Sequence, residues 1–303
     1  MTSLPRTNRV ICDYLDVTYS PADVPYPAVN RLLLDAGFFV ESYDRVKFVY
    51  THPAELAGTL VVGPTRGRMR ISTSGAICRL LRSLGLWEQY LFELGQSPHN
   101  VTRLDAALDL AMDGADLVAA MRKRHPGGSV NLRRKSVKTT VMLAVRDDGR
   151  ETGTWYAGQG SKARLTARVY DKAWEALCKR GEVIPPTARV EVTARSREVG
   201  VTLRDAMLPD ALFWHIAAPA ILTAPEDAPM FVPNTEPSCT APPPRDFDPA
   251  DLLRRRVESL AMLDALALVA DEMGPNGREY LLSLFRKRLE SPVASEAVDV
   301  DAA

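Results

Sequence analysis

Three carboxylates in two strand-like segments are the first groups whose placement suggests chemistry. Alternate residues of a strand share a face, so the segment RLDAALDL would place Asp105 and Asp109 on one side of a sheet. In the segment ARVEV, Glu191 would lie on the polar side. Hard divalent cations such as Mg²⁺ take oxygen ligands, typically one or two carboxylates together with phosphate and water. Carboxylates on one sheet face could therefore support metal-assisted chemistry on a phosphodiester.

A tyrosine in the segment ARLTARVYDK could supply a nucleophile. Alternation places Tyr170 on the same face as Arg164 and Arg168, with Lys172 two residues beyond. A phenol ionises only near pH 10 and is a poor nucleophile unaided. Nearby cations favour the phenolate, so Arg168 and Lys172 could activate Tyr170. Tyr156, in the segment TWYAG, is a competing candidate.

Each of these patterns also has a purely structural explanation. An antiparallel sheet often has one solvated face, where polar residues belong. Asp105 and Glu191 could simply form ion pairs with Arg164 or Arg189 across strands. The combination of acids, guanidinium groups and tyrosines on one face is what fits a metal-assisted phosphodiester site.

Alternating strands and helices must position these residues. Periodicity and turn signals predict an α+β fold, a mainly antiparallel sheet with helices packed on it. The predicted strands lie at 9–20, 58–64, 67–75, 101–114, 138–145, 151–160, 163–171 and 187–195. The predicted helices lie at 26–37, 77–95, 114–125, 172–181 and 203–222.

A proline-rich stretch divides the chain. Eight of the 26 residues at 224–249 are proline, which is typical of a stiff, extended linker. Residues 1–223 are predicted to form the main domain. Beyond the linker, an apolar stripe with Asp248 as N-cap predicts a small helical segment at 250–290. The polar tail at 291–303 is predicted to be disordered.

Composition places the chain among ordinary globular proteins. Its 303 residues are 46% hydrophobic and 25% charged, which allows a sizeable core. The most apolar run, ALFWHIAAPAIL, is too short to span a bilayer, and the N-terminus lacks a signal-peptide pattern. Four cysteines without a CxxC pair argue against structural zinc. They favour a reducing compartment, so the cytoplasm is the expected location.

A net charge of zero conceals a separation of charge along the chain. Residues 121–146 hold eight basic and no acidic side chains, whereas 225–303 hold eight basic and fifteen acidic ones. The basic stretch is either a solvated face or a surface that binds a polyanion. Arg133, Arg134 and Lys135, in the segment NLRRKSVK, could contact DNA phosphates from a hairpin or loop.

Four segments, in their order and spacing, resemble the replication initiation factor family. This family includes Rep_trans-type initiators of rolling-circle plasmids, relaxases of conjugative elements and initiators of some filamentous phages. Its pattern is an Arg-x-Asp strand, a Thr-x-Tyr-x-Gly segment, an Arg-hydrophobic-Tyr-x-Lys-x-x-Glu segment and an Arg-Val-Glu strand. The matching residues are Arg103 and Asp105; Thr154, Tyr156 and Gly158; Arg168, Val169, Tyr170, Lys172 and Glu175; and Arg189, Val190 and Glu191. The resemblance covers about residues 10–215.

The resemblance implies an enzyme that binds an origin of replication and nicks one DNA strand. Tyr170 would be the nucleophile, with Arg168 and Lys172 as catalytic cations. The protein would remain on the 5′ phosphate as a phosphotyrosine, and the free 3′-hydroxyl would prime synthesis. The implied host element is a phage, a plasmid or a conjugative element.

The resemblance also implies a divalent cation, Mg²⁺ or Mn²⁺, held by Asp105 and Glu191, with Asp109 as a weaker candidate. The implied fold is distantly like the His-hydrophobe-His (HUH) nucleases. The four histidines contain no His-x-His pair, so carboxylates rather than histidines would hold the metal. The expected contacts to origin DNA, partly single-stranded at the nick, come from Arg133, Arg134, Lys135, Arg164 and Tyr156. A host helicase or polymerase and a second copy of the chain are further expected partners.

Two other functions are consistent with the same residues. A DNA-binding regulator with an inactive site would keep the basic surface and need no metal. An adaptor would recruit a helicase or recombinase through the acidic C-terminal helices. The presence of Tyr170, Asp105 and Glu191 favours the nicking enzyme over the regulator.

Overall fold

The computed structural model describes one stretch of the chain almost continuously. This stretch is residues 9–234, without 44–46, 66, 134, 160–162 and 196–198, and the isolated positions 279 and 283 are described as well. Contacts divide the chain into two units, Met1–Ala241 and Pro242–Ala303. The predicted C-terminal helical segment (apart from 279 and 283), the tail and most of the linker lie outside the described residues.

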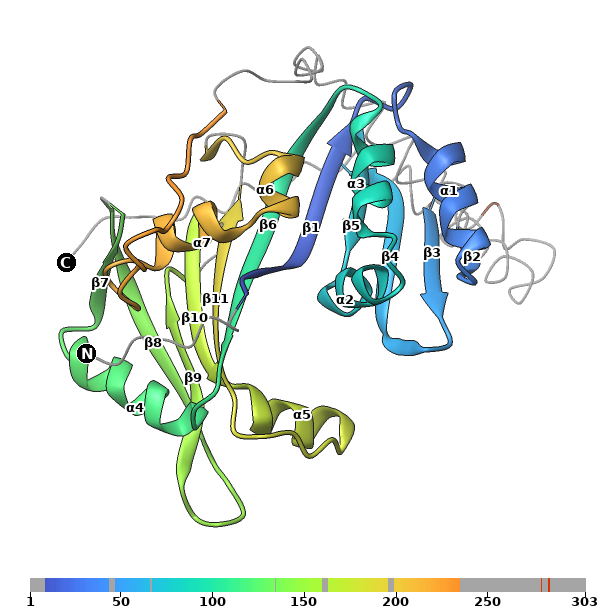
Figure 1. Cartoon of the computed structure of the whole chain (residues 1–303). Coiled ribbons are helices and arrows are strands. Elements are labelled where there is room, and N and C mark those ends of the chain that lie inside the picture. The colour runs from blue at the N-terminus through green and yellow to red at the C-terminus, as the bar shows by residue number, and fades with distance from the viewer. Residues whose placement is uncertain are drawn as a thin grey trace. The chain divides into compact units, whose positions relative to one another are not determined.

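The first unit is built on one eleven-stranded sheet (Figure 1). Its strands are β1 (Ile11–Tyr19), β2 (Phe39–Tyr43), β3 (Lys47–His52), β4 (Glu55–Thr65), β5 (Arg68–Thr73), β6 (His99–Leu110), β7 (Ser129–Leu132), β8 (Lys135–Val145), β9 (Glu151–Ala157), β10 (Leu165–Asp171) and β11 (Ala188–Arg195). Their order is β2-β3-β4-β5-β1-β6-β11-β10-β9-β8-β7. Every strand pair in the described residues is antiparallel, which confirms the predicted α+β class.

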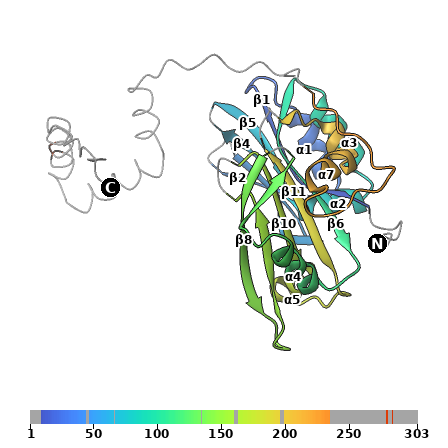
Figure 2. The same ribbon diagram turned by 90° about the vertical axis from the view of Figure 1, so that its left-hand side faces the viewer.

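Helices gather on one side of this sheet, as Figure 2 shows from its edge. They are α1 (Tyr26–Asp35), α2 (Gly75–Ser83), α3 (Trp87–Gly95), α4 (Gly114–Arg124), α5 (Lys172–Arg180), α6 (Leu203–Met207) and α7 (Asp210–Ala217). α2 packs on β1 and β4, α4 on β9 and β10, and α7 on β6 and β11. None of the described helices is long and apolar enough to cross a membrane.

The core lies between these helices and the sheet. Leu15, Leu104, Trp155, Val190 and Phe213 are at most 1% exposed. Burying a large apolar side chain contributes about 1.5–3 kcal/mol to folding. Alternate residues of a strand point to opposite faces of the sheet. Because the apolar strand residues face the core, the polar residues that alternate with them lie on the other face of the sheet.

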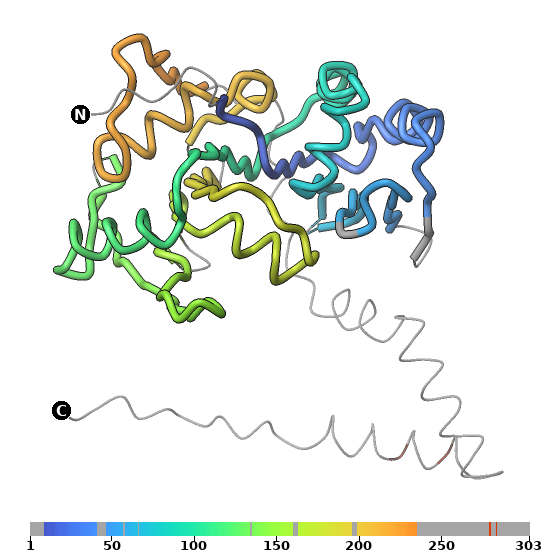
Figure 3. Tube along the Cα trace, turned by 60° about the horizontal axis from the view of Figure 1, so that its bottom comes forward, coloured from blue at the N-terminus to red at the C-terminus, as the bar shows by residue number. Residues whose placement is uncertain are grey.

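The two halves of the sheet repeat one arrangement. In the first half, β1 is followed by α1 and a four-stranded meander whose last strand, β5, returns to pair with β1. In the second half, β6 is followed by α4, another meander, α5 and then β11, which returns to pair with β6. Figure 3 shows the first half in blue to cyan beside the second half in green to yellow. All four motif segments lie in the second half.

The structure corrects two helices and adds three strands. The helix predicted at 77–95 is two helices, α2 and α3, because Gly85 between them has a left-handed φ of 72°, which glycine adopts at little cost. The helix predicted at 203–222 is α6 and α7, separated at Pro209, which lacks the amide hydrogen that a continuous helix needs. The strands β2, β3 and β7 were not predicted.

The described part of the predicted linker contacts the first unit. Phe231 is 5% exposed, and its ring centroid lies 5.0 Å from that of His215 on α7. The amide of Asn234 donates to the carbonyl of Gly200 at 2.9 Å. Residues up to 234 therefore pack with the sheet domain rather than leaving it at 224.

The first turn of α4 carries an ion-pair network whose contribution to stability depends on pH. Asp113 caps the helix by accepting from the amide of Ala115 at 2.8 Å, and it accepts from Arg146 and Arg150. Hydrogen bonds from Arg146, the main cause, lower the pKa of Asp113 to about 2 although burial opposes them. We expect Asp113→Asn, which keeps a capping side chain, to lose about 1 kcal/mol of unfolding free energy at pH 7.

This contribution is present above the unfolded-state pKa of about 3.9. It disappears as the pH falls toward 2, because the folded-state pKa of Asp113 is the lower of the two. Urea unfolding of wild type and Asp113→Asn at pH 7, 4 and 2.5 measures the difference. A gap that is unchanged at pH 2.5 would show that the charge of Asp113 is not its source.

Candidate functional site

The register of four adjacent strands brings the motif segments together on the face of the sheet opposite the core. Tyr156 on β9, Arg168 on β10 and Glu191 on β11 are direct cross-strand neighbours, and we call them the Glu191 row. Side chains of directly opposite residues lie within contact distance of each other. Segments that are far apart in the sequence therefore form one line across the sheet.

A second line, the Tyr170 row, lies beside the first. Tyr170 on β10 pairs with Thr154 on β9 and with Arg189 on β11. Arg189 in turn pairs with Asp109 on β6. Because Tyr170 follows Arg168 by two residues, the two rows share a face and are neighbours.

A third line, the Asp105 row, lies on the other side of the Glu191 row. Asp105 on β6 pairs with Thr193 on β11 and with Tyr14 on β1. Asp105 and Glu191 are therefore diagonal neighbours on adjacent strands. We use the term polar face for the side chains of these three rows.

The two carboxylates at the centre of the polar face are buried beneath guanidinium groups. Asp105 and Glu191 are each 2% exposed. Asp105 accepts from Nε and Nη2 of Arg103 at 2.9 and 2.5 Å, and Glu191 accepts from Nη2 of Arg168 at 2.6 Å. The partners are thus Arg103 and Arg168, rather than the expected Arg164 or Arg189. The face is not a solvated one at its centre, because the arginine side chains cover the acids.

The electrostatics of Glu191 reflect this burial. Loss of water raises the pKa of Glu191 to about 7; Arg168 opposes the rise, and the charge of Asp105 adds to it. Two neighbouring carboxylates disfavour each other's ionised form. A cation placed between them would relieve this repulsion.

A shallow concavity of about 220 Å³ opens over the Glu191 row. Arg103, Arg168 and Arg195 line it together with Tyr156 and Glu191. The Nε atom of Arg168 is buried and has no hydrogen-bond partner among the described residues. Guanidinium groups are suited to phosphate oxygens by charge and by their fixed fork of donors, so an anionic ligand fits this concavity.

Tyr170 lies one row away from the concavity and is 6% exposed. The guanidinium carbon of Arg168 lies 5.2 Å from its ring centroid, and Nζ of Lys172 lies 5.7 Å away. Burial raises the pKa of Tyr170, and it outweighs the opposing effects of Arg189 and Arg168. Arg168 thus acts in the expected direction, but burial has the larger effect, and the hydroxyl is neutral in this state of the protein.

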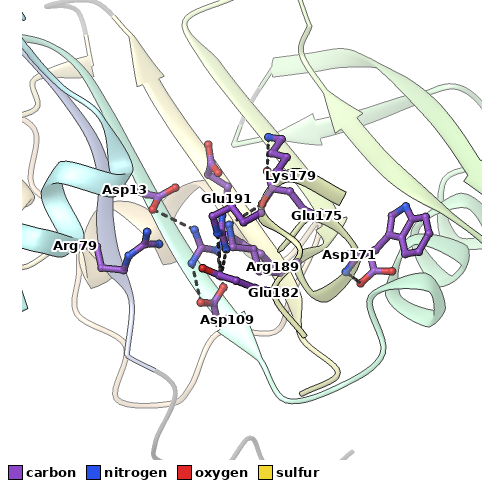
Figure 4. Close-up of polar contacts among 12 residues, drawn as sticks. Asp13, Arg79, Asp109, Asp171, Glu175, Lys179, Glu182, Arg189 and Glu191 are labelled. Atoms are coloured by element: carbon purple, nitrogen blue, oxygen red, sulfur yellow. Dashed lines mark hydrogen bonds and ion pairs between the residues drawn. The ribbon is translucent and has the colours of Figure 1, made fainter. Parts of the chain in front are cut away.

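The charge of Lys172 is shared with its own helix. Lys172 donates to Glu175 at 2.6 Å. Lys179 donates to the same carboxylate at 2.8 Å (Figure 4). Burial acts to raise the pKa of Glu175, but these two hydrogen bonds outweigh it and hold the pKa at about 2. Lys172 is therefore paired with an acid of its own helix, whereas the Nε atom of Arg168 has no hydrogen-bond partner among the described residues.

Arg189 connects two acids at the edge of the polar face, as Figure 4 shows. It donates to both oxygens of Asp109, at 2.5 and 2.7 Å, and to Asp13 at 3.1 Å. Asp109, the weaker metal candidate, thus has both oxygens engaged by an arginine. No cluster of three or more His, Cys, Asp or Glu side chains suited to a metal occurs in the described part of the chain.

The predicted DNA-contacting residues fall into two places. Tyr156 lines the concavity on the polar face. A separate cavity is lined by Arg133 in the turn between β7 and β8, by Lys135 at the start of β8 and by Arg164 before β10. The NLRRKSVK segment forms a hairpin, which is one of the two alternatives predicted for it. Arg134 lies outside the described residues.

Three residues of the polar face were missed by sequence reasoning. Arg195 lines the concavity, and strand alternation from Glu191 would have placed it there. Tyr14 lies under the guanidinium of Arg103, at 4.1 Å from its ring centroid. Asp13 reaches Arg189 where the register of β1 shifts between Cys12 and Tyr14, and the sequence carries no signal for that bulge.

Comparisons with known proteins find similar chains among the solved structures. No protein-family model matches the sequence, and no curated protein matches it. The chain is similar to the solved structure of a rolling circle replication initiator protein from Geobacillus stearothermophilus, with 20% identity and a TM-score of 0.43 over 62% of this chain and 74% of that one. It is also similar to the di-domain ARO/CYC protein BexL, with 14% identity and a TM-score of 0.17 over 71% of this chain and 99% of that one. Both TM-scores are low, so the function proposed below is argued from the residues of the polar face.

Proposed function

We propose that the chain initiates rolling-circle DNA replication by nicking one strand of an origin through Tyr170. The observation that carries the proposal is the convergence of the four motif segments on neighbouring rows of one sheet face. A strand-cleaving site needs cations for the phosphate, acids for a metal and a hydroxyl nucleophile. The polar face supplies each of these groups.

The reaction that fits these groups is a transesterification. The Tyr170 hydroxyl oxygen attacks the phosphorus, the bond from phosphorus to the 3′ oxygen breaks, and a phosphotyrosine forms on the 5′ end. The Tyr170 hydroxyl loses one proton in this step, and the departing 3′ oxygen takes up one proton. Arg168 and Arg103 would bind the phosphate oxygens, where developing negative charge is stabilised.

The two central carboxylates fit a divalent cation in their donor type. Asp105 and Glu191 are hard oxygen donors on adjacent strands, and Asp105 raises the pKa of Glu191. Mg²⁺ is commonly held by one or two carboxylates plus substrate phosphate and water, so two acids suffice. A bound cation would polarise the phosphate. Asp109 is left out of this assignment because its side chain is 43% exposed and is held by Arg189 at the edge of the polar face, whereas Asp105 and Glu191 are buried at its centre.

The proposal is tested on a supercoiled plasmid that carries the cognate origin, incubated with the full chain and Mn²⁺ or Mg²⁺. We expect nicked circles whose 5′ end carries covalently bound protein, and no nicking when EDTA removes the metal. Asp105→Asn is expected to raise the Mn²⁺ concentration for half-maximal nicking by at least about tenfold. The products are resolved on denaturing gels with and without protease.

Binding of origin DNA without any cleavage would instead favour the regulator that lacks an active site. Cleavage that is unaffected by EDTA would exclude the metal role of Asp105 and Glu191. Recruitment of a host helicase or polymerase, and pairing of two copies, are additions that the nicking role would accommodate. The acidic C-terminal segment that could serve such roles lies almost wholly outside the described residues.

A further inference from the structure

A cavity of about 870 Å³ lies at the end of the sheet where β8 and β10 begin. The turn between β7 and β8, the residues just before β10 and helix α7 all contribute to its wall. Cavities of about 300–1,000 Å³ are the usual size for small organic ligands. The cavity is therefore large enough for a ligand the size of a nucleotide.

Its wall combines two kinds of side chain. Arg133, Lys135 and Arg164 supply positive charge, which favours an anionic group such as phosphate. Leu132, Val137 and Leu165 supply apolar surface. A ligand that matches both has a flat or apolar body joined to an anion.

His215 adds a specific polar group to this wall. Its Nε2 atom is buried and has no hydrogen-bond partner among the described residues. The ring of Phe231 packs against the imidazole in a tilted arrangement, with 5.0 Å between the ring centroids. Burial, followed by the charge of Arg133, lowers the pKa of His215, so the ring is neutral at neutral pH. A neutral ring nitrogen can donate or accept one hydrogen bond with a heterocyclic base. Buried polar atoms in proteins are nearly always hydrogen-bonded, so a partner for Nε2 is expected.

We propose that this cavity binds one nucleotide, with its phosphate on Arg133, Lys135 and Arg164 and its base against the apolar wall, hydrogen-bonded to Nε2 of His215. The same chemistry is offered by a free nucleotide and by a nucleotide of single-stranded DNA. The second source rests on the function proposed above, and it makes the cavity a subsite for a base next to the nick.

The backbone favours the DNA strand as the source. The carbonyl of Arg164, which lines the cavity, accepts from the amide of Arg195 at 2.7 Å. Arg195 lines the concavity on the polar face. The two hollows thus border the same paired ends of β10 and β11, and one strand of DNA could pass from one to the other around this end of the sheet.

Binding measurements with the full chain test the cavity. The probes are a fluorescently labelled oligo-dT of about twelve nucleotides, read by anisotropy, and free dTMP, read by calorimetry. Val137→Trp fills the cavity, and Arg164→Gln removes one of its cations. Val145→Trp, on the same strand but 63% exposed, and Arg31→Gln, on exposed α1 surface, are the matched controls. Circular dichroism melts check that each variant is folded.

We expect both cavity variants to weaken binding at least tenfold, while the controls stay within about twofold of wild type. Weakening seen with oligo-dT alone identifies the DNA strand as the source, and weakening with dTMP as well identifies a free nucleotide. If Val137→Trp does not fold, Arg164→Gln decides together with His215→Leu, which removes the ring nitrogens but keeps an apolar side chain. Unchanged binding of both probes by the folded cavity variants would overturn the proposal.

The plasmid assay separates this inference from the proposed function. If the wild-type chain never nicks DNA but the cavity variants lose nucleotide binding, the subsite is supported and the nicking role is rejected. If the wild-type chain nicks through Tyr170 but the cavity variants bind both probes normally, the nicking role is supported and the subsite is rejected.

Discussion

Replacing Tyr170 with phenylalanine is expected to lower the rate of origin nicking by at least about a thousandfold, the order of effect seen when an enzyme loses its nucleophile. The change removes only the hydroxyl group and keeps the aromatic ring at this position of β10, so the fold should persist. No hydrogen bond joins this hydroxyl to another described residue, and Arg168 lies 5.2 Å from the ring centroid. Single-turnover relaxation of supercoiled plasmid, with denaturing gels for the covalent adduct, measures the loss.

Tyr156→Phe is the matched control, since Tyr156 is the direct cross-strand neighbour of Arg168 and lines the concavity. We expect it to reduce nicking about tenfold or less through weaker DNA contact. If Tyr156→Phe abolishes the covalent adduct and Tyr170→Phe does not, the nucleophile is Tyr156. If both variants form the adduct at the wild-type rate, neither Tyr170 nor Tyr156 is the nucleophile.

Replacing Arg189 with methionine is expected to cost about 3 kcal/mol of unfolding free energy. The Arg189 side chain is 6% exposed and bridges Asp109 and Asp13 across three strands. Removing it leaves two carboxylates without their cation, one of them, Asp13, 17% exposed. A buried charge without a partner is strongly destabilising, and Asp109, which is 43% exposed, retains some water, so the loss lies at the lower end of the usual range.

Urea unfolding at pH 7 measures this loss against Arg122→Met. Arg122 pairs with Glu151 at 2.9 Å, but both side chains are more than 40% exposed, so its loss should stay within about 1 kcal/mol. Adding Asp109→Met to Arg189→Met should recover part of the stability, because the unpaired acid is removed. Equal losses for Arg189→Met and Arg122→Met would show that burial adds nothing to the Arg189 bridge.

Local sequence patterns predicted which residues would share a face. Alternation along each strand put Asp105, Glu191 and Tyr170 on polar sides, and the register confirms that these sides are one continuous face. The same patterns predicted the antiparallel sheet and most of its strands. They did not separate the helix at Gly85, because an amphipathic stripe continues across that turn while the backbone does not.

The partners of the charged groups could not be predicted in this way. Asp105 was expected to pair with Arg164 or Arg189 if it had only a structural role, but its partner is Arg103 on its own strand. The pKa of Tyr170 is raised rather than lowered, because burial outweighs the nearby cations. Neither result depends on residue type alone; each depends on how much water the neighbouring strands and α5 exclude.

The sequence by itself determined the chemistry available to this protein: acids, guanidinium groups and tyrosines at alternate strand positions, and a basic segment. Only the tertiary structure decided which of them meet. Strand register is set by pairing between segments distant in the chain, and it aligned Tyr156, Arg168 and Glu191 in one row. The cavity beside His215 likewise arises from β8, β10 and α7 together. Alternation is a local property of the backbone, whereas register, burial and cavities depend on contacts between distant segments.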